Sequence, residues 1–147
     1  MENTLVLIKP DGLQRRLVGE ILGRYEAKGL QIVGLKMVRI TKDLAGRHYA
    51  AHQGKPFYPG LITYICSGPV IALVLSGRNA IAVTRSLMGA TFGSKAVCGT
   101  LRGDLAISDG LNLVHGSDSP EAAAQEIALH FRPEELHQAP SADLAWV

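Results

Sequence analysis

The order in which strand-like and helix-like segments follow one another is the strongest constraint that this sequence places on its fold. Four short apolar segments, rich in β-branched residues, predict strands at residues 4–8, 31–40, 70–75 and 105–107. Segments with helical spacing fall between them. Two β-α-β halves with four strands predict an α/β (α+β) fold, a ferredoxin-like sandwich. We expect one four-stranded antiparallel sheet covered by helices.

The segments between the strands carry the spacing and the end signals of helices. Apolar side chains at 18, 21, 22 and 25 share one helix face, and Gly29 can end that helix. Thr41 and Asn79 can each begin a helix, the second of which ends near Met88. The predicted helices cover residues 18–29, 41–51, 79–88 and 120–131. Residues 54–69 are broken by Gly and Pro and predict a loop with a short helix or helical pair.

The length and composition of the chain indicate one globular domain. A chain of 147 residues, 47% apolar and 19% charged, can bury its own core. We expect a single domain over residues 1–147, with residues 137–147 as a carboxy-terminal tail. Leu144 and Trp146 would be poorly placed in water, so we expect the tail to pack on something, such as a neighbouring subunit.

The charge and the cysteine content limit the possible partners of the protein and its cellular compartment. A net charge of +2 with no basic stripe argues against a nucleic-acid partner. No apolar run approaches the roughly 20 residues that span a membrane, so we expect no membrane partner. Cys66 and Cys98 lie in no metal or redox motif, which is typical of reduced thiols in a cytoplasmic protein.

The segment Asn-Leu-Val-His-Gly-Ser-Asp at residues 112–118 combines a histidine with a constrained backbone. Residues 119–121 (Ser-Pro-Glu) then begin a helix, whose first backbone N–H groups favour anions. Gly116 leaves room beside His115 for a bulky ligand. The residue types alone leave open whether His115 is catalytic or structural.

Other candidate residues are also ambiguous on residue type alone. Lys9 follows the first predicted strand, where it is either a rim residue or a ligand for phosphate or sugar in a crevice. His48 and His52 are spaced four apart on a predicted helix, which can bind zinc, but no third ligand is evident. We therefore expect two exposed helix histidines there. The chain has no Walker loop, no Gly-x-Gly-x-x-Gly and no protein-kinase motif.

The histidine segment resembles the active-site signature of the nucleoside diphosphate kinases. Further short segments resemble that family in the same order, at residues 8–12, 17–21, 48–49, 55–57, 67–70, 99–104 and 132–136. The resemblance covers about residues 4–136, and the collinear order of its weak pieces makes a chance match implausible.

The resemblance implies an enzyme that transfers the γ-phosphoryl group of a nucleoside triphosphate, mainly ATP, to a nucleoside diphosphate. The transfer is a ping-pong reaction through a phosphohistidine at His115. The resemblance further implies that Glu126 orients the histidine ring. Ser117 and Tyr49 match neighbours that help to hold this carboxylate and the phosphoryl group.

The same resemblance implies the nucleotide-binding residues. Arg85, Arg102 and Thr91 match phosphate ligands. Lys9 and Asn112 match a pair that binds ribose and a nearby phosphate oxygen, which overturns the rim interpretation of the lysine. The base is expected to stack on Phe57, and His52 matches a position that touches the α-phosphate in some members. Mg²⁺ is expected on the nucleotide phosphates, with no protein metal site.

Four residues depart from the family pattern. Phe92 and Gly93 replace an Asn-Pro pair and Cys98 replaces a proline, which predicts a looser loop and weaker subunit contacts. Asp109 stands where a small apolar residue commonly covers the second face of the base, which predicts weaker stacking or a changed base preference. Family members are hexamers or tetramers, and the long tail favours a hexamer.

Two alternative functions belong to other functional classes. A non-catalytic nucleotide-binding or scaffold protein is expected to have lost its nucleophile or its arginines, whereas His115, Arg85, Arg102 and Lys9 are all present. A nucleic-acid-binding regulator is disfavoured by the small net charge. The sequence therefore favours the enzyme.

Overall fold

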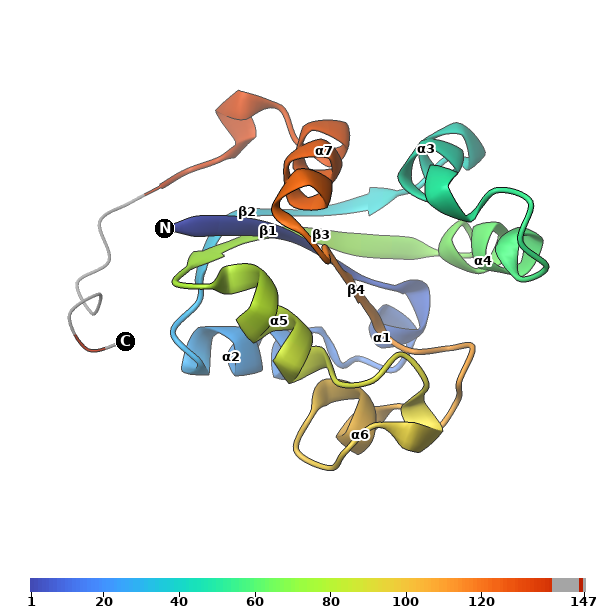
Figure 1. Ribbon diagram of the computed structural model, residues 1–147, viewed down its shortest axis with the longest axis horizontal. Coiled ribbons are helices and arrows are strands. Elements are labelled where there is room, and N and C mark those ends of the chain that lie inside the picture. Colours follow the sequence, from blue (N-terminus) through green and yellow to red (C-terminus); the bar gives the residue numbers. More distant parts are fainter. Residues whose placement is uncertain (139–145, 147) are drawn as a thin grey trace.

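A computed structural model describes residues 1–138 and residue 146, and these form a four-stranded antiparallel sheet with helices on both faces (Figure 1). The strands are β1 (Glu2–Ile8), β2 (Gln31–Arg39), β3 (Pro69–Gly77) and β4 (Val114–Gly116). Their spatial order is β2-β3-β1-β4, and each neighbouring pair is antiparallel. The predicted ferredoxin-like sandwich is therefore confirmed.

The helices connect the strands and cover the sheet. They are α1 (Pro10–Gln14), α2 (Val18–Ala27), α3 (Lys42–His48), α4 (Tyr58–Ile65), α5 (Ala80–Met88), α6 (Leu101–Leu105) and α7 (Pro120–His130), with 3₁₀ turns at Ala50–His52, Gly93–Lys95 and Pro133–Glu135. Helices α2 and α5 lie on one face of the sheet, and α3 and α7 lie on the other (Figure 1). None of the described helices is long and apolar enough to cross a bilayer.

Side chains alternate along β1 and so enter two separate cores. Val6 and Ile8 pack with residues of α2 and α5 in one core. Leu5 and Leu7 pack with residues of α3, α4 and α7 in the other. All four side chains are fully buried, and each contributes about 1.5–3 kcal/mol by leaving water. Strand β1 is thereby fixed on both faces, and it provides a rigid edge for β4.

The predicted strand at residues 105–107 is wrong. Leu105 is the last residue of α6, the next two residues follow the helix, and Ile107 is 93% exposed. Thr100 begins α6 because its hydroxyl accepts a hydrogen bond from the Gly103 amide at 3.0 Å. This side-chain cap outweighs the β propensity of a short apolar run. The fourth strand lies further along the chain and contains His115.

Three of the four residues that depart from the resembled pattern, Phe92, Gly93 and Cys98, lie in the loop between α5 and α6, and the fourth, Asp109, follows α6. Gly93 is buried, and a Cβ atom there would lie 2.1 Å from the Ala106 carbonyl oxygen, so only glycine fits. Asp109 accepts hydrogen bonds from the Ser94 amide at 3.1 Å and from the Ser94 hydroxyl at 2.7 Å. These bonds hold the pKa of the Asp109 carboxyl below its usual value. These side-chain bonds thus join the loop between α5 and α6 to the segment that follows α6.

Asn79 stands at the start of α5, as predicted, but its side chain makes no capping bond. Glu2 of β1 accepts a hydrogen bond from the Ile81 amide instead, at 2.9 Å. The expected packing of the tail concerns Leu144, which lies outside the described residues, and Trp146, which is exposed.

We predict that Thr100→Val lowers the free energy of unfolding by about 1 kcal/mol, because the substitution removes the cap of α6 without changing side-chain shape. The control is Thr63→Val, which removes an exposed hydroxyl bonded to the Pro59 carbonyl inside α4 and should change stability by less than about 0.5 kcal/mol. Urea unfolding followed by circular dichroism measures both. Equal stability of Thr100→Val and the unmodified protein would contradict this account of α6.

Candidate active site

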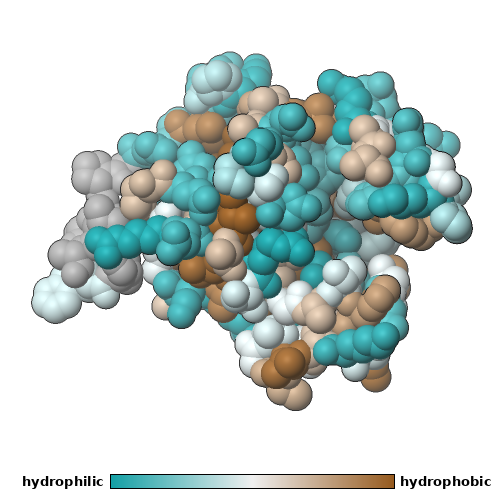
Figure 2. Space-filling view, viewed as in Figure 1, coloured by the Kyte–Doolittle hydropathy of each residue, from teal (hydrophilic) through white to brown (hydrophobic). Residues whose placement is uncertain are grey.

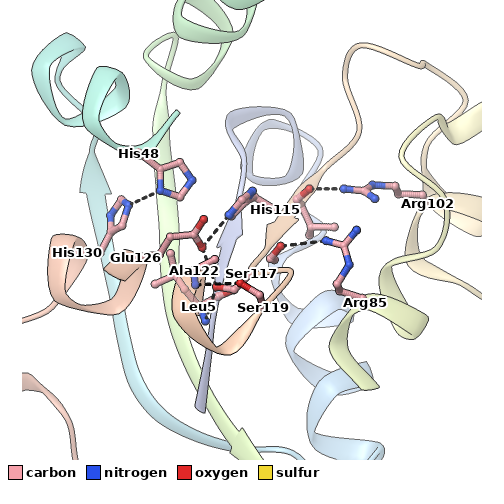
Figure 3. A network of polar contacts seen from close by, with 12 residues as sticks. Leu5, His48, Arg85, Arg102, His115, Ser117, Ser119, Ala122, Glu126 and His130 are labelled. Carbon is pink, nitrogen blue, oxygen red and sulfur yellow. Dashed lines mark hydrogen bonds and ion pairs between the residues drawn. The ribbon is translucent and has the colours of Figure 1, made fainter. Parts of the chain in front are cut away.

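His115 lies in the centre of β4, directly opposite Leu7 of β1. Its Nε2 atom is 3.0 Å from Oε2 of Glu126 on α7 (Figure 3). An ionised carboxylate only accepts hydrogen bonds, so Nε2 carries the proton and donates it. The lone pair of the ring is then on Nδ1. Glu126 therefore selects which nitrogen of His115 is free to react.

Glu126 is itself held in place by β1 and α7. The Ser117 hydroxyl donates to Glu126 Oε2 at 2.7 Å, and the same hydroxyl accepts from the Leu5 amide at 3.3 Å. Burial acts to raise the pKa of Glu126, but the hydrogen bonds from His115 and Ser117 outweigh it and lower that pKa. The carboxylate is thus ionised and anchored, and the structure brings His115, Glu126 and Ser117 together as the resemblance implied.

Lys9 and Asn112 form a second polar pair, also as the resemblance implied. Lys9 follows β1, and its Nζ donates to Asn112 Oδ1 at 2.7 Å. The Asn112 amide nitrogen donates to the Thr91 carbonyl at 2.9 Å, while Thr91 itself is exposed. Burial, followed by the charge of Arg102, lowers the pKa of Lys9 to about 8. This lysine is a desolvated cation, which binds an anion more strongly than an exposed one.

Two arginines bracket the backbone around His115. Arg85 of α5 donates to the Gly116 carbonyl at 3.2 Å. Arg102 of α6 is buried and donates to the Val114 carbonyl at 2.7 Å and to the Asn112 carbonyl at 3.0 Å. The two guanidinium groups therefore bond the backbone carbonyls just before and just after His115, and both lie on the same side of the ring (Figure 3). They fix the strand and place positive charge near the ring.

A strained turn at Leu113 precedes the histidine. Leu113 is fully buried and has a φ of 69°, a left-handed conformation that costs a branched residue roughly 1–2 kcal/mol. Its amide donates to Asp11 at 3.1 Å, and its carbonyl accepts from the Lys9 amide at 2.7 Å. The Tyr64 hydroxyl donates to the other oxygen of Asp11. This clamp fixes the residues on either side of the turn.

Sequence reasoning missed the clamp. No sequence pattern indicated a contact between Asp11 and either Tyr64 or Leu113. Asp11 and Tyr64 are 53 positions apart, and Asp11 and Leu113 are 102 apart. No local pattern signals contacts at such separations.

The expectation that His48 and His52 are exposed on one helix is wrong for both, because both are partly buried and His52 lies in a separate 3₁₀ turn. Helix α3 ends at His48, whose ring lies against the His115 ring with 4.5 Å between centroids. His48 Nδ1 is 3.2 Å from His130 Nε2. Burial and the charge of His115 lower the pKa of His48 to about 2, and burial chiefly lowers that of His130 to about 4. Both rings are therefore uncharged near neutral pH.

The remaining predicted side chains lie beside this cluster. Phe57 is 54% exposed, and the His52 ring lies edge-on to it at 5.4 Å between centroids. Lys55, which received no role from the sequence, has its Nζ 3.0 Å from His52 Nδ1. The Tyr49 ring meets the His115 ring edge-on at 6.0 Å, and its hydroxyl has no partner among the described residues. An exposed aromatic ring, Phe57, thus lies beside His52, where a base could stack.

The arrangement combines an oriented nucleophile with positive charge. The Nδ1 lone pair of His115 can attack an electrophile, and Glu126 stabilises the positive charge that develops on the ring. Lys9, Arg85 and Arg102 suit an anionic substrate, especially a phosphate whose oxygens spread negative charge.

Comparisons with known proteins identify one family. The family model described as nucleoside diphosphate kinase matches residues 2–136. The nucleoside diphosphate kinase of Thermus thermophilus is 56% identical over 136 residues, covering 92% of this chain and 99% of that protein. The one from Roseiflexus sp. is 52% identical over 147 residues, with 100% and 99% covered. The structure of a halophilic nucleoside diphosphate kinase from Halobacterium salinarum in complex with CDP has a TM-score of 0.96 and 48% identity, covering 99% of this chain and 97% of that one.

We predict that ADP binding weakens as pH rises above about 8, because Lys9 loses its proton there and with it the attraction for phosphate. A single deprotonation limits the loss to roughly tenfold per pH unit. Lys9→Arg should flatten this dependence, since a guanidinium keeps its charge to above about pH 12. Titration calorimetry between about pH 7 and about pH 10 measures both. An unmodified protein whose affinity is constant over this range would contradict the assignment.

Proposed function

The chain belongs to the nucleoside diphosphate kinase family, and from this premise we propose that His115 is the residue that carries the phosphoryl group. The protein is a phosphotransferase that moves the γ-phosphoryl group of a nucleoside triphosphate to a nucleoside diphosphate. Its family works by a ping-pong mechanism through a phosphohistidine. The single observation that carries the assignment to His115 is its 3.0 Å contact with Glu126, which leaves Nδ1 with the lone pair.

In the first half of the cycle, Nδ1 of His115 attacks the γ-phosphorus of the triphosphate, with ATP as the main donor. A nitrogen–phosphorus bond forms, and the bond from that phosphorus to the β–γ bridging oxygen breaks. The nucleoside diphosphate leaves with the electron pair. The ring becomes cationic, and Glu126 stabilises it through Nε2.

In the second half, a terminal oxygen of another nucleoside diphosphate attacks the same phosphorus. The nitrogen–phosphorus bond breaks, and the lone pair returns to Nδ1. One site serves donor and acceptor in turn, so the base must be held without strict selection. The exposed ring of Phe57 supports this, because stacking tolerates any base.

We assign the binding of phosphate to Arg85, Arg102 and Thr91, and the binding of ribose and a nearby phosphate oxygen to Lys9 and Asn112. The burial of Lys9 and the positions of the arginines around β4 support this assignment. Ser117 holds Glu126, and Tyr49 packs against the His115 ring. We assign contact with the α-phosphate to His52, and its ring contact with Phe57 supports this assignment.

We propose that Mg²⁺ enters on the nucleotide as part of the substrate. Among the described residues, the one group of side chains suited to hold a metal ion contains two histidines and one carboxylate. Magnesium prefers oxygen ligands, so this nitrogen-rich group does not fit it. The cations Lys9, Arg85 and Arg102 then share the task of neutralising the phosphates.

We further propose that the chain forms a homo-oligomer, with a hexamer favoured over a tetramer. Two separate apolar surfaces support an assembly larger than a dimer. The first is the outer edge of the sheet, where Leu35 and Met37 of β2 are exposed. The second lies around α6 and its loops, where Figure 2 shows apolar side chains and where Val97 and Ile107 are exposed. A cytoplasmic location fits the two free cysteines.

We predict that incubation with Mg-ATP adds one phosphoryl group to the protein and that addition of GDP removes it. His115→Ala should show no added mass, because the attacking nitrogen is gone. The matched control is His137→Ala, which alters an exposed histidine and should be phosphorylated like the unmodified protein. Intact-mass spectrometry under non-acidic conditions measures all three.

Each failure of that experiment has a distinct meaning. An adduct that survives in His115→Ala shows that another residue is the nucleophile. No adduct on the unmodified protein, with ATP still bound, favours the non-catalytic alternative and points to the altered loop or to Asp109.

We predict a mass in solution of six chains of 15.7 kDa each. Light scattering coupled to gel filtration measures this mass. A stable tetramer or dimer would overturn the hexamer, and Met37→Lys should shift the distribution towards smaller species by charging the exposed sheet edge.

A further inference from the structure

We propose that His48, His115 and Glu126 form a binding site for a divalent ion of the zinc class, and that an ion bound there inhibits the enzyme reversibly. Each of the three side chains offers one ligand atom, and these atoms all lie within 4.8 Å of one another. The three come from the end of α3, the centre of β4 and the middle of α7, so the fold rather than a local motif assembles them (Figure 3).

His48 is the residue that turns the pair His115–Glu126 into a possible metal site. Its Nε2 atom is buried and has no hydrogen-bond partner among the described residues. Its Nδ1 atom contacts His130 Nε2 at 3.2 Å. When Nδ1–H donates to His130, the lone pair of His48 is on the unpartnered Nε2. A metal-ligating histidine is commonly oriented in this way, by donating its second ring nitrogen to a neighbouring acceptor.

The donor set selects the class of ion. Two imidazole nitrogens and one carboxylate are a ligand set of catalytic zinc sites, which keep a fourth position for water. Magnesium and calcium prefer oxygen ligands and do not suit this set. The site therefore separates a zinc-class ion from the magnesium that enters with the nucleotide.

Inhibition follows from the tautomer of His115. A metal ion on Nε2 of His115 takes the position of the proton that Nε2 otherwise donates to Glu126. In the neutral ring that proton moves to Nδ1, which then has no lone pair for attack on phosphorus. Metal binding does not depend on the role of His115 in the reaction; the inhibition alone depends on the proposed function.

The test of binding uses Co²⁺ as a spectroscopic probe on the full-length protein without nucleotide. We expect one Co²⁺ per chain, with the visible absorption of a four- or five-coordinate ion. His48→Gln should weaken binding more than tenfold, because it removes a ligand. His130→Phe leaves all three ligands but removes the partner of His48, and should weaken binding by roughly 10–100-fold. The control His137→Gln alters an exposed histidine and should bind like the unmodified protein.

Several outcomes overturn the site. An octahedral Co²⁺ spectrum, or equal affinity in the unmodified protein and in both the His48 and His130 variants, shows surface binding only. Circular dichroism checks that each variant is folded. If His48→Gln does not fold, the metal affinity of His130→Phe tests the site instead.

The test of inhibition compares Zn²⁺ titrations of the unmodified protein and His48→Gln at fixed Mg-ATP, each relative to its own chelator-treated rate. We expect the variant to need more than tenfold more Zn²⁺ for the same inhibition. Equal sensitivity shows that zinc acts on the nucleotide, and overturns the inhibitory role. If His115→Ala is still phosphorylated while Co²⁺ binding requires His48, the proposed nucleophile fails and the metal site stands.

Discussion

The left-handed turn at Leu113 is the constraint on which the geometry of the site depends. A branched side chain avoids this conformation, so the turn persists only because its surroundings over-determine it. Asp11 and the Lys9 amide hold the two polar groups of its peptide units, and the side chain is sealed in the core. The strain is small beside the several buried hydrogen bonds that it allows. It places Asn112 and His115 at fixed positions within four residues of chain, and the hydrogen bond from the Lys9 amide brings the end of β1 against the turn.

Positive charge exceeds negative charge within the site. Lys9, Arg85 and Arg102 lie near β4, and among the described residues the Arg102 guanidinium donates its hydrogen bonds to backbone carbonyls. Glu126 is already committed to His115 and Ser117. The positive charge is therefore complementary to a polyanionic ligand. A nucleotide is a polyanion of this kind. The pKa of Lys9 is lowered because burial removes water from its charged ammonium group.

The parts of the fold that follow from local signals were predictable. The buried runs of β1 and β3, the apolar face of α2 and the Ser-Pro start of α7 all carry their structure in a few adjacent residues. Strand β4 was misplaced because it is three residues long and has a polar histidine at its centre. The Thr100 cap likewise concealed α6 within a stretch that looked like a strand.

The site was predictable only in part, and for a different reason. Its residues came from the resemblance to a family, since residue types alone left His115 and Lys9 ambiguous. The contacts of His48 could not be foreseen, because its position depends on α3 ending at that residue rather than three residues later. The Asp11–Tyr64 clamp joins distant segments, and only the folded chain brings them together.

The long reach of β4 back to β1 has a consequence for how this protein becomes active during its synthesis. Leu5 and Ser117 are bonded across 112 positions, and the Glu126 contact needs still later residues. A chain emerging from the ribosome presents β1 first, with one edge open until almost the whole sequence has appeared. No shorter nascent piece can hold the histidine beside its carboxylate. The contact between His115 and Glu126 therefore forms only when translation is nearly complete, and chains cut short upstream of α7 lack it.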